Sequence, residues 1–306
     1  MRAHSPKEVA EVDFDSEVMG GPAQIRLTGL DRRLLESGAQ AAITEIKRIE
    51  QAYSRYRHDS IVSRINAAAG TGKALAVDTE CASLLDFAQT LYLQSNGLFD
   101  ITSGVWRRVW DFRTARLPST QTLAAIKPLV GWDQVAWDGH HIYLPHAGME
   151  LDFGGFGKEY AADCAAAVLI RHGIHAGFVN LAGDIRVLGP RLNGKAWQFG
   201  IQHPRRNSGL VANVALSHGA LATSGDYERF FELDGKRYCH LLNPRSGMPV
   251  QHWQSISVRA PLCIAAGAMC TCGMLMGTAG AQWLRDQGAS FLAVDPQGQT
   301  AMHEWS

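Results

Sequence analysis

Apolar residues recur at helical spacing in two long segments of the N-terminal half. The first begins at Asp31 and runs to about Tyr53, with apolar side chains every three or four residues. The second runs from about Thr79 to Asn96 and is followed by Gly97, a typical helix stop. These patterns predict two amphipathic helices whose apolar faces belong to the core.

Shorter stretches of β-favouring residues predict hairpins on either side of these helices. One lies between Glu11 and Gly29, around the turn sequence Met19-Gly20-Gly21-Pro22. Another lies between Gly131 and Pro145, where Asp138-Gly139 is a strong hairpin signal. Both segments are therefore expected to fold as locally paired strands.

A glycine-rich turn separates a predicted strand from a predicted helix near the middle of the chain. The strand is expected over Met149–Phe153, the turn over Gly154–Gly157 and the helix from Lys158 to about His172. A further apolar strand is expected over Gly177–Leu181. The order predicts a βαβ-like unit.

The C-terminal third is mostly strand by pattern and closes with helices. Strands are expected between Trp197 and Arg259, and two helices between Pro261 and Gln287. The predicted turns are Ser224-Gly225-Asp226, Asp234-Gly235, Asn243-Pro244-Arg245-Ser246-Gly247 and, in a closing hairpin, Asp295-Pro296-Gln297-Gly298. We find no repeat, low-complexity tract or linker, which predicts a single α+β domain over residues 1–306, with mixed and antiparallel sheets packed by helices and about 15 flexible N-terminal residues.

Composition narrows the functional classes. The chain has 306 residues, of which 46% are hydrophobic and 19% charged, with 29 basic and 29 acidic side chains. This balance argues against binding nucleic acid or an anionic membrane through bulk charge. No apolar run approaches a membrane span, and the N-terminus has neither a signal segment nor a lipid-attachment cysteine. We expect a cytoplasmic protein, or a periplasmic one if a leader has been removed.

The cysteines do not indicate a disulfide framework or a structural zinc site. Six cysteines are sparse in 306 residues, and they lack the C-x2-C pairs typical of zinc ligands. Most have apolar neighbours, so we expect reduced thiols in the core.

The glycine-rich turn does not match the common phosphate-binding motifs. In a P-loop ending at Gly157-Lys158, the first glycine would fall on Asp152 and the Ser or Thr on Glu159. The dinucleotide fingerprint fails at Tyr160. Taken alone, the turn is as compatible with close packing between strand and helix as with ligand binding.

Further segments combine turn glycines with polar side chains. They are residues 54–60 with Asn66, residues 97–100, residues 222–227 and residues 240–247. Together with the glycine-rich turn, and in this order, they resemble the FAD:protein FMN transferase family of the ApbE type over about Val18 to Gly277. The resemblance implies an ApbE-like, T-fold-like α+β fold.

The resemblance also implies roles for individual residues. His240 is implied as the catalytic residue beside the reacting pyrophosphate, and the Gly157 carbonyl and Thr271 as donors to Mg²⁺. The implied FAD-binding residues are Met19, Tyr56, Leu98, Phe99, Asp100, Asp152, Lys158, Ser224, Gly225, Asp226 and Arg245. The segment Asn180–Asp184 matches a structural turn of the family.

Each of these residues also has a purely structural interpretation. Tyr56 and Phe99 could be core aromatics, and His240 a partly buried histidine at a strand end. Asp100 and Asp226 could cap turns.

The implied chemistry is transfer of FMN to a protein. A Thr or Ser hydroxyl of a target flavoprotein bearing a flavinylation motif attacks the FAD pyrophosphate, which joins FMN through a phosphoester and releases AMP. An imidazole such as that of His240 has a suitable intrinsic pKa for a general base. Mg²⁺ would offset the charge on the phosphoryl oxygens.

One departure from the family pattern concerns the metal. The family's D-x-x-x-T helix segment reads Gly267-Ala-Met-Cys-Thr271, so the expected carboxylate is absent, and a neighbouring Asp could take its place. Milder departures are Gly157, where the family pattern has alanine, Glu159 and Ala182, where it has glycine, and Asn243, where it has aspartate. Two alternatives therefore stay open: an FAD-binding carrier or partner module with weak or lost transfer, and a hydrolase that converts FAD to FMN and AMP.

Overall fold

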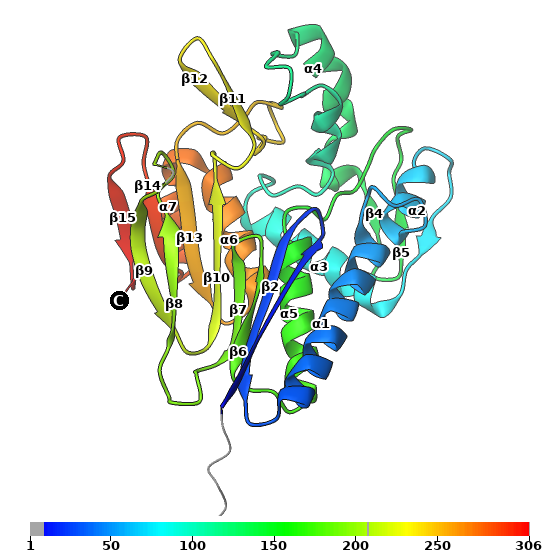
Figure 1. Ribbon diagram of the computed structural model, residues 1–306. Coiled ribbons are helices and arrows are strands. Elements are labelled where there is room, and N and C mark those ends of the chain that lie inside the picture. Colours follow the sequence, from blue (N-terminus) through cyan, green and yellow to red (C-terminus); the bar gives the residue numbers. More distant parts are fainter. Residues whose placement is uncertain (1–8, 207, 306) are drawn as a thin grey trace, which may run out of the picture. The chain divides into compact units, whose positions relative to one another are not determined.

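The computed structural model describes residues 9–206 and 208–305, and most of its elements follow the predicted order (Figure 1). They group into two units that alternate along the chain. The first unit comprises the described residues up to Glu50, Phe156–Thr223 and Ser257–Gly267. The second comprises Gln51–Gly155, Ser224–Ile256 and the described residues from Ala268 onward.

Antiparallel strands form the framework of the first unit. In sheet order these strands are β1 (Ala10–Val18), β2 (Gly21–Gly29), β6 (Gly177–Leu181), β7 (Asp184–Gly189), β10 (Gly219–Gly225) and β13 (Ser255–Ala260). A separate hairpin joins β8 (Trp197–Gln202) to β9 (Leu210–Leu216). Alternate residues of β8 are buried and exposed, as expected for a strand with one solvated face.

The predicted N-terminal hairpin is confirmed, with a two-residue turn at Met19-Gly20. Both turn residues have positive φ, 53° and 74°, the conformation that a tight hairpin turn needs. Because β1 begins at Ala10, the expectation of a flexible segment reaching about residue 15 is wrong for residues 10–15. Residues 1–8 lie outside the described part.

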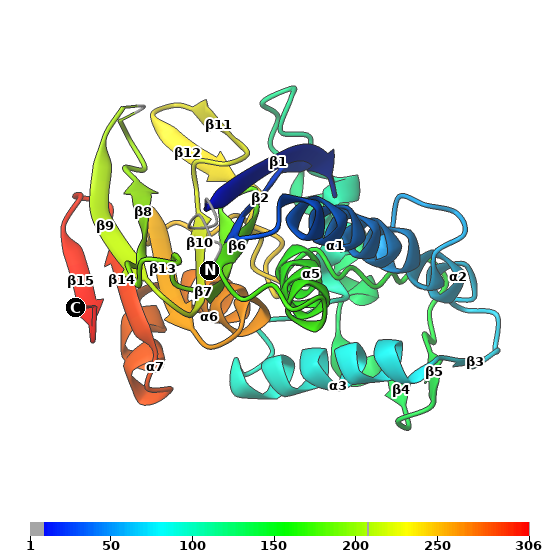
Figure 2. The same ribbon diagram turned by 60° about the horizontal axis from the view of Figure 1, so that its bottom comes forward.

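Two helices pack side by side in the first unit, α1 (Arg32–Tyr53) and α5 (Gly157–Arg171) (Figure 2). Asp31 caps α1 by accepting a hydrogen bond from the Leu34 N–H at 3.1 Å. Gly38 allows the close approach, because a Cβ at this position would lie 2.3 Å from Ile174 Cδ1, just after α5. A third helix, α6 (Cys263–Leu275), begins in this unit.

The predicted strand Met149–Phe153 is wrong, and so is the βαβ-like unit. The backbone of Leu151 bonds to the Asn66 side-chain amide on both sides, at 2.6 and 3.0 Å, and the Asp152 N–H donates to the Ile101 carbonyl at 2.8 Å. These partners replace a strand ladder. The strand that follows α5, β6, pairs antiparallel with both β2 and β7.

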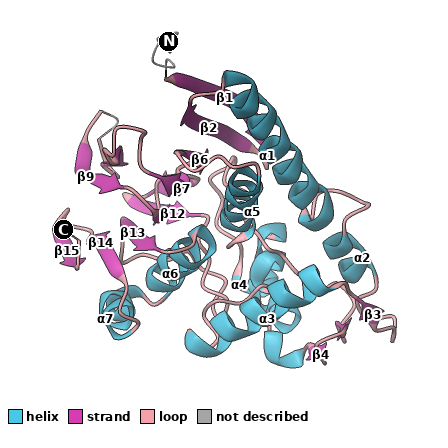
Figure 3. Cartoon of the chain, turned by 90° about the horizontal axis from the view of Figure 1, so that it is seen from below, coloured by secondary structure: helices cyan, strands magenta, loops and turns pink. Residues whose placement is uncertain are grey.

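The second unit combines short strands with helices. Its helices are α2 (Ile61–Ala67), α3 (Thr79–Gln94), α4 (Thr120–Ile126), α7 (Gly280–Asp286) and the 3-10 helices η1 (Ser103–Arg108), η2 (Lys127–Leu129), η3 (Trp132–Gln134) and η4 (Gly277–Ala279). Its strands are β3 (Leu75–Ala76), β4 (Ala136–Trp137) and β5 (His141–Tyr143) in one sheet, and the hairpins β11 (Phe230–Leu233) with β12 (Lys236–Cys239) and β14 (Ser290–Val294) with β15 (Thr300–His303). Figure 3 shows α7 beside the β14–β15 hairpin.

An aromatic cluster in the second unit holds the turn at residues 243–247. Trp106, Trp110, Phe231 and Tyr238 are buried together. The indole N–H of Trp106 donates to the Pro244 carbonyl at 3.1 Å, and that of Trp110 donates to the Gly247 carbonyl at 2.7 Å. The core therefore fixes the turn at residues 243–247 from inside.

The broad predictions of fold class and thiol state are confirmed. Helices and mixed sheets give an α+β fold, and all six cysteines are free thiols, five of them buried. Within the described ranges, no helix is both long and apolar enough to cross a bilayer.

Candidate functional site

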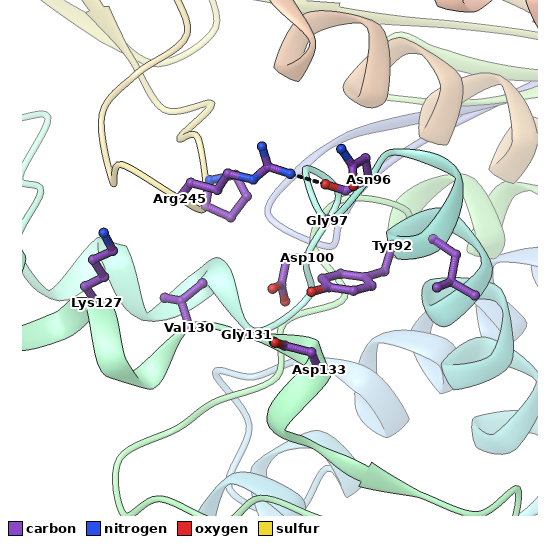
Figure 4. A pocket seen from close by; sticks show the side chains of 11 residues that line it. Tyr92, Asn96, Gly97, Asp100, Lys127, Val130, Gly131, Asp133 and Arg245 are labelled. Atoms are coloured by element: carbon purple, nitrogen blue, oxygen red, sulfur yellow. Dashed lines mark hydrogen bonds between the residues drawn. The ribbon is translucent and has the colours of Figure 1, made fainter.

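A pocket of about 540 Å³ opens in the second unit (Figure 4). It lies between the end of α3, the segment around η2 and η3, and the turn at residues 243–247. Its lining residues are Tyr92, Leu93, Asn96, Gly97, Asp100, Lys127, Val130, Gly131, Asp133, Pro244 and Arg245. Two residues predicted for FAD binding, Asp100 and Arg245, thus line one cavity.

Asp100 is held in place by hydrogen bonds. Its carboxylate accepts from the Thr102 N–H at 2.7 Å, the Thr102 hydroxyl at 2.6 Å and the Trp132 N–H at 3.1 Å. Burial raises the pKa of Asp100, and these hydrogen bonds oppose that shift. The carboxylate therefore fixes the pocket wall between two segments that are 30 residues apart in the chain.

Arg245 reaches the pocket from a rigid turn. The Asn243 side chain accepts from the N–H groups of Arg245 and Ser246, at 2.9 and 3.3 Å, an Asx turn. The guanidinium donates to the carbonyl of Asn96 at the opposite edge (Figure 4). With Lys127 on the same rim, the pocket offers two cations to an anionic ligand.

The predicted aromatic residues differ sharply in exposure. Tyr56 is 77% exposed, and its ring centroid lies 5.8 Å from the Arg55 guanidinium, so its ring is available for stacking. Phe99 is buried, and a Cβ on Gly155 would lie 2.9 Å from its ring. Phe99 thus packs under the glycine-rich turn, while Leu98 is half-buried beside it.

Asp152 belongs to a partly buried network of ion pairs around Arg55. Its carboxylate accepts from the guanidinium of Arg55, which also donates to Glu150 at 2.8 Å. Burial opposes the charge of Glu150, but the hydrogen bond from Arg108 and the charges of Arg107, Arg108 and Arg55 lower its pKa. Asp152 also accepts from the Gly154 N–H at 2.9 Å, which links the network to the glycine-rich turn.

Residues predicted from separate motifs meet where β10 ends. The Ser224 and Thr271 hydroxyls lie 3.2 Å apart and share a hydrogen bond. Ser224 and Gly225 are the last residues of β10, so the predicted turn at 224–226 is wrong for these two. Asp226 follows the strand, forms an ion pair with Arg237 at 3.5 Å and donates its N–H to the Gln254 carbonyl at 2.9 Å.

His240 and Met19 both sit where strands end. His240 follows β12 and donates its backbone N–H to the Arg229 carbonyl at 2.9 Å, so the hairpin with β11 sets its position. Met19 is half-buried in the turn between β1 and β2.

The first turn of α5 carries two charged side chains. Lys158 forms an ion pair with Asp184, at the start of β7. Burial opposes the charge of Lys158, but Asp184 and Glu159 outweigh it and raise its pKa. The turn before Asp184 has Ala182 and Gly183 at positive φ, 52° and 98°, and Asn180 accepts from the Gly183 N–H at 2.9 Å. The predicted structural turn is confirmed.

Glu159, the next residue of α5, is buried. Burial raises the pKa of its carboxyl to about 8, with a further contribution from Asp184, while Lys158 lowers it. Its Oε2 atom has no hydrogen-bond partner within the described residues. Nearby, Asp163 accepts from the first N–H groups of α6, those of Cys263 and Ile264, at 3.0 and 2.9 Å.

Comparison with known proteins decides the family. The family model named ApbE family matches residues 19–293, which is most of the chain. The chain belongs to the ApbE family.

Two curated relatives of this ApbE family chain are both named FAD:protein FMN transferase. The FAD:protein FMN transferase of Klebsiella pneumoniae is 28% identical over 306 residues, covering 96% of this chain and 87% of the relative. That of Escherichia coli K12 is 26% identical, covering 94% and 85%. The crystal structure of the ApbE protein of Thermotoga maritima superposes with a TM-score of 0.88 at 28% identity, covering 96% and 97%. The flavin transferase ApbE of Vibrio cholerae gives 0.85 at 24% identity, covering 97% of each chain.

The ApbE resemblance did not identify several residues of the site. Asn96, Lys127 and Asp133 line the pocket, yet they lie in segments without a distinctive motif. The resemblance places Asp184 in a structural turn and does not predict its ion pair with Lys158. Glu159 was a mild departure in the sequence, although an acidic residue among the alanines of a buried helix is itself a signal.

Proposed function

We propose that this chain is a transferase that moves FMN from FAD to a Thr or Ser hydroxyl of a target flavoprotein. The observation that carries the proposal is the ApbE family match over residues 19–293, because it runs through every segment that supplies a predicted site residue up to Thr271. The shared name of the curated relatives supports the same activity.

The proposed reaction breaks a phosphoanhydride bond and forms a phosphoester bond. The target hydroxyl oxygen attacks the phosphorus of the FMN half of FAD, and the bond from that phosphorus to the phosphate of AMP breaks. AMP leaves, and the hydroxyl proton passes to a base. We assign this base to His240, since imidazole titrates near neutral pH and such a base is worth about 10² to 10⁴ in rate.

The proposed FAD contacts divide by chemistry. The exposed ring of Tyr56 supplies a stacking surface for the flavin. Arg245 supplies charge to the pyrophosphate, and a bound phosphate would compete with the Asn96 carbonyl for its guanidinium. The other proposed contacts are Met19, Leu98, Phe99, Asp100, Asp152, Lys158, Ser224, Gly225 and Asp226.

We propose that the reaction also uses a divalent cation. The proposed donors are the Gly157 carbonyl and the Thr271 hydroxyl, both hard oxygen atoms of the kind that Mg²⁺ prefers. The buried Oε2 of Glu159 has no hydrogen-bond partner among the described residues, which supports a cation near the start of α5. When bound, the cation would offset negative charge on the phosphoryl oxygens.

Transfer is tested with purified protein, FAD, MgCl₂ and a target protein carrying a flavinylation motif. The expected result is flavin fluorescence on the denatured target band together with an equal amount of AMP. His240→Ala should lower the transfer rate by about 10² or more while FAD still binds. A target with its acceptor Thr replaced by Ala is the matched control for labelling.

Other outcomes would replace the proposal by one of its alternatives. AMP released without a labelled target would indicate an FAD hydrolase. Bound FAD with neither product would indicate a flavin carrier. Wild-type rates in His240→Ala would remove His240 as the base.

A further inference from the structure

The carboxylate of Glu159 occupies the space beside Gly267. Glu159 stands in the first turn of α5 and Gly267 in α6, and both belong to the first unit. A Cβ built on Gly267 would lie 2.5 Å from Oε1 of Glu159, 2.6 Å from its Cγ and 2.8 Å from its Cδ. The Glu159 side chain therefore fills the volume that a side chain at position 267 would need.

The charged side chains near Glu159 form ion pairs with one another, and neither of these pairs includes Glu159. Lys158 pairs with Asp184, and Arg186 pairs with Asp163 at 2.9 Å. These two pairs cancel, so an ionised Glu159 is an uncompensated negative charge. A buried charge without a partner is strongly unfavourable.

Protonation of Glu159 does not satisfy the site either. Within the described residues, Oε2 has no hydrogen-bond partner of either kind, so a carboxylic acid O–H at this atom would find no acceptor. A buried polar group without a partner costs about 1 to 3 kcal/mol. A ligand from outside the chain that accepts electron pairs from oxygen removes this cost, and a metal cation is such a ligand.

We propose that Glu159 supplies the anionic ligand of a divalent cation beside Gly267, in place of the aspartate that the ApbE-type pattern puts at position 267. The inference rests on the proposed function, because that function gives the cation its role beside the phosphoryl oxygens. The two departures from the pattern are then reciprocal: a glycine is replaced by Glu159, and an aspartate is replaced by Gly267. The carboxylate reaches the same place from α5 instead of α6.

The chemistry restricts the cation to a hard one. The oxygen atoms of a carboxylate suit Mg²⁺ or Mn²⁺. Cys263 at the start of α6 is a poor competitor as a ligand, because burial and the charges of Asp184 and Glu159 raise the pKa of its thiol.

Mn²⁺ binding tests the proposal directly. Full-length protein loaded with FAD is titrated with MnCl₂, and free Mn²⁺ is followed by electron paramagnetic resonance. Glu159→Gln keeps the shape but removes the charge, and should weaken Mn²⁺ binding by about tenfold or more. Glu36→Gln, which removes an exposed charge from α1, is the matched control and should bind as the wild type does.

A double variant moves the carboxylate back. Glu159→Gly with Gly267→Asp should restore Mn²⁺ affinity to within about tenfold of the wild type. It also keeps the proposal testable if Glu159→Gln folds poorly, which circular dichroism would show.

The outcomes separate this inference from the proposed function. Wild-type Mn²⁺ affinity in folded Glu159→Gln, or no Mn²⁺ binding by the wild type, would overturn the inference even if FMN transfer proceeds. Conversely, Mn²⁺ binding that depends on Glu159, without any FMN transfer to a target, would leave the inference standing and defeat the proposed function.

Discussion

Asp100 in the second unit and Glu159 in the first are equally buried, each with 7% of its surface exposed, yet they have opposite surroundings. Asp100 accepts three hydrogen bonds from Thr102 and Trp132. Glu159 has an oxygen without a partner among the described residues. Burial raises the pKa of both carboxyl groups. Burial alone therefore does not distinguish a carboxylate that stabilises the fold from one that we propose as a metal ligand. The hydrogen-bond partners make that distinction.

The largest effect is expected from Asp100→Ala. The substitution strands two buried N–H groups and a hydroxyl, and should lower the free energy of unfolding by about 3 kcal/mol. Urea unfolding measures this. Asp133→Ala, on the exposed side of the same pocket, should change it by less than about 0.5 kcal/mol. Equal effects of the two substitutions would contradict the structural role of Asp100.

A comparable effect on stability is expected at Glu159, but this one depends on Mg²⁺. Mg²⁺ at about 100 times its dissociation constant should stabilise the wild type by about 2.7 kcal/mol, and EDTA should remove this gain. Glu159→Gln should gain only about 1.4 kcal/mol or less, because a site at least tenfold weaker is then at no more than about 10 times its dissociation constant. Thermal unfolding with and without MgCl₂ gives the comparison, and an Mg²⁺ response as large as that of the wild type would count against Glu159 as the ligand.

A smaller effect, with a change of sign, is expected at Gly267. In the wild type, Gly267→Ala crowds the Glu159 carboxylate and should destabilise by about 1 kcal/mol. In a Glu159→Ala background, the same substitution should stabilise by up to about 1 kcal/mol, because alanine favours the helix. Denaturant unfolding of the four proteins gives the coupling. Additive effects would show that the two side chains do not compete for space.

The smallest effect is expected from Tyr56→Ala, which should change FAD affinity but not the stability of the fold. Because Tyr56 is 77% exposed, its loss should leave the unfolding free energy within about 0.5 kcal/mol of the wild type. FAD affinity should fall by about 1 kcal/mol through lost stacking. Flavin fluorescence titration measures the affinity, and an unchanged value would place the ring away from the flavin.

The sequence was most informative where one local signal dominated. Asp31 starts α1, Gly97 follows α3, and the turn at Asp234-Gly235 joins β11 to β12, with φ values of 52° and 73°. Periodicity and turn chemistry suffice for such elements because their hydrogen bonds are local.

Prediction failed where partners came from distant parts of the chain. Residues 149–153 have the apolar pattern of a strand, but the side-chain amide of Asn66, 85 residues before Leu151, forms both hydrogen bonds with the Leu151 backbone. No local sequence pattern predicts these hydrogen bonds to Asn66. The pairing of Lys158 with Asp184 and the contact of Glu159 with Gly267 are equally non-local, so substitutions that looked independent in the sequence proved to be neighbours.

The shared space of Glu159 and Gly267 also constrains how such a chain can change over evolutionary time. A protein with acidic side chains at both positions would have to fit two carboxyl groups where the distances of 2.5 to 2.8 Å leave room for one. A protein with glycine at both would have none there. Either intermediate is disfavoured, so the two sites should mutate as a pair and divide related sequences into two groups, each with its acid on a different helix.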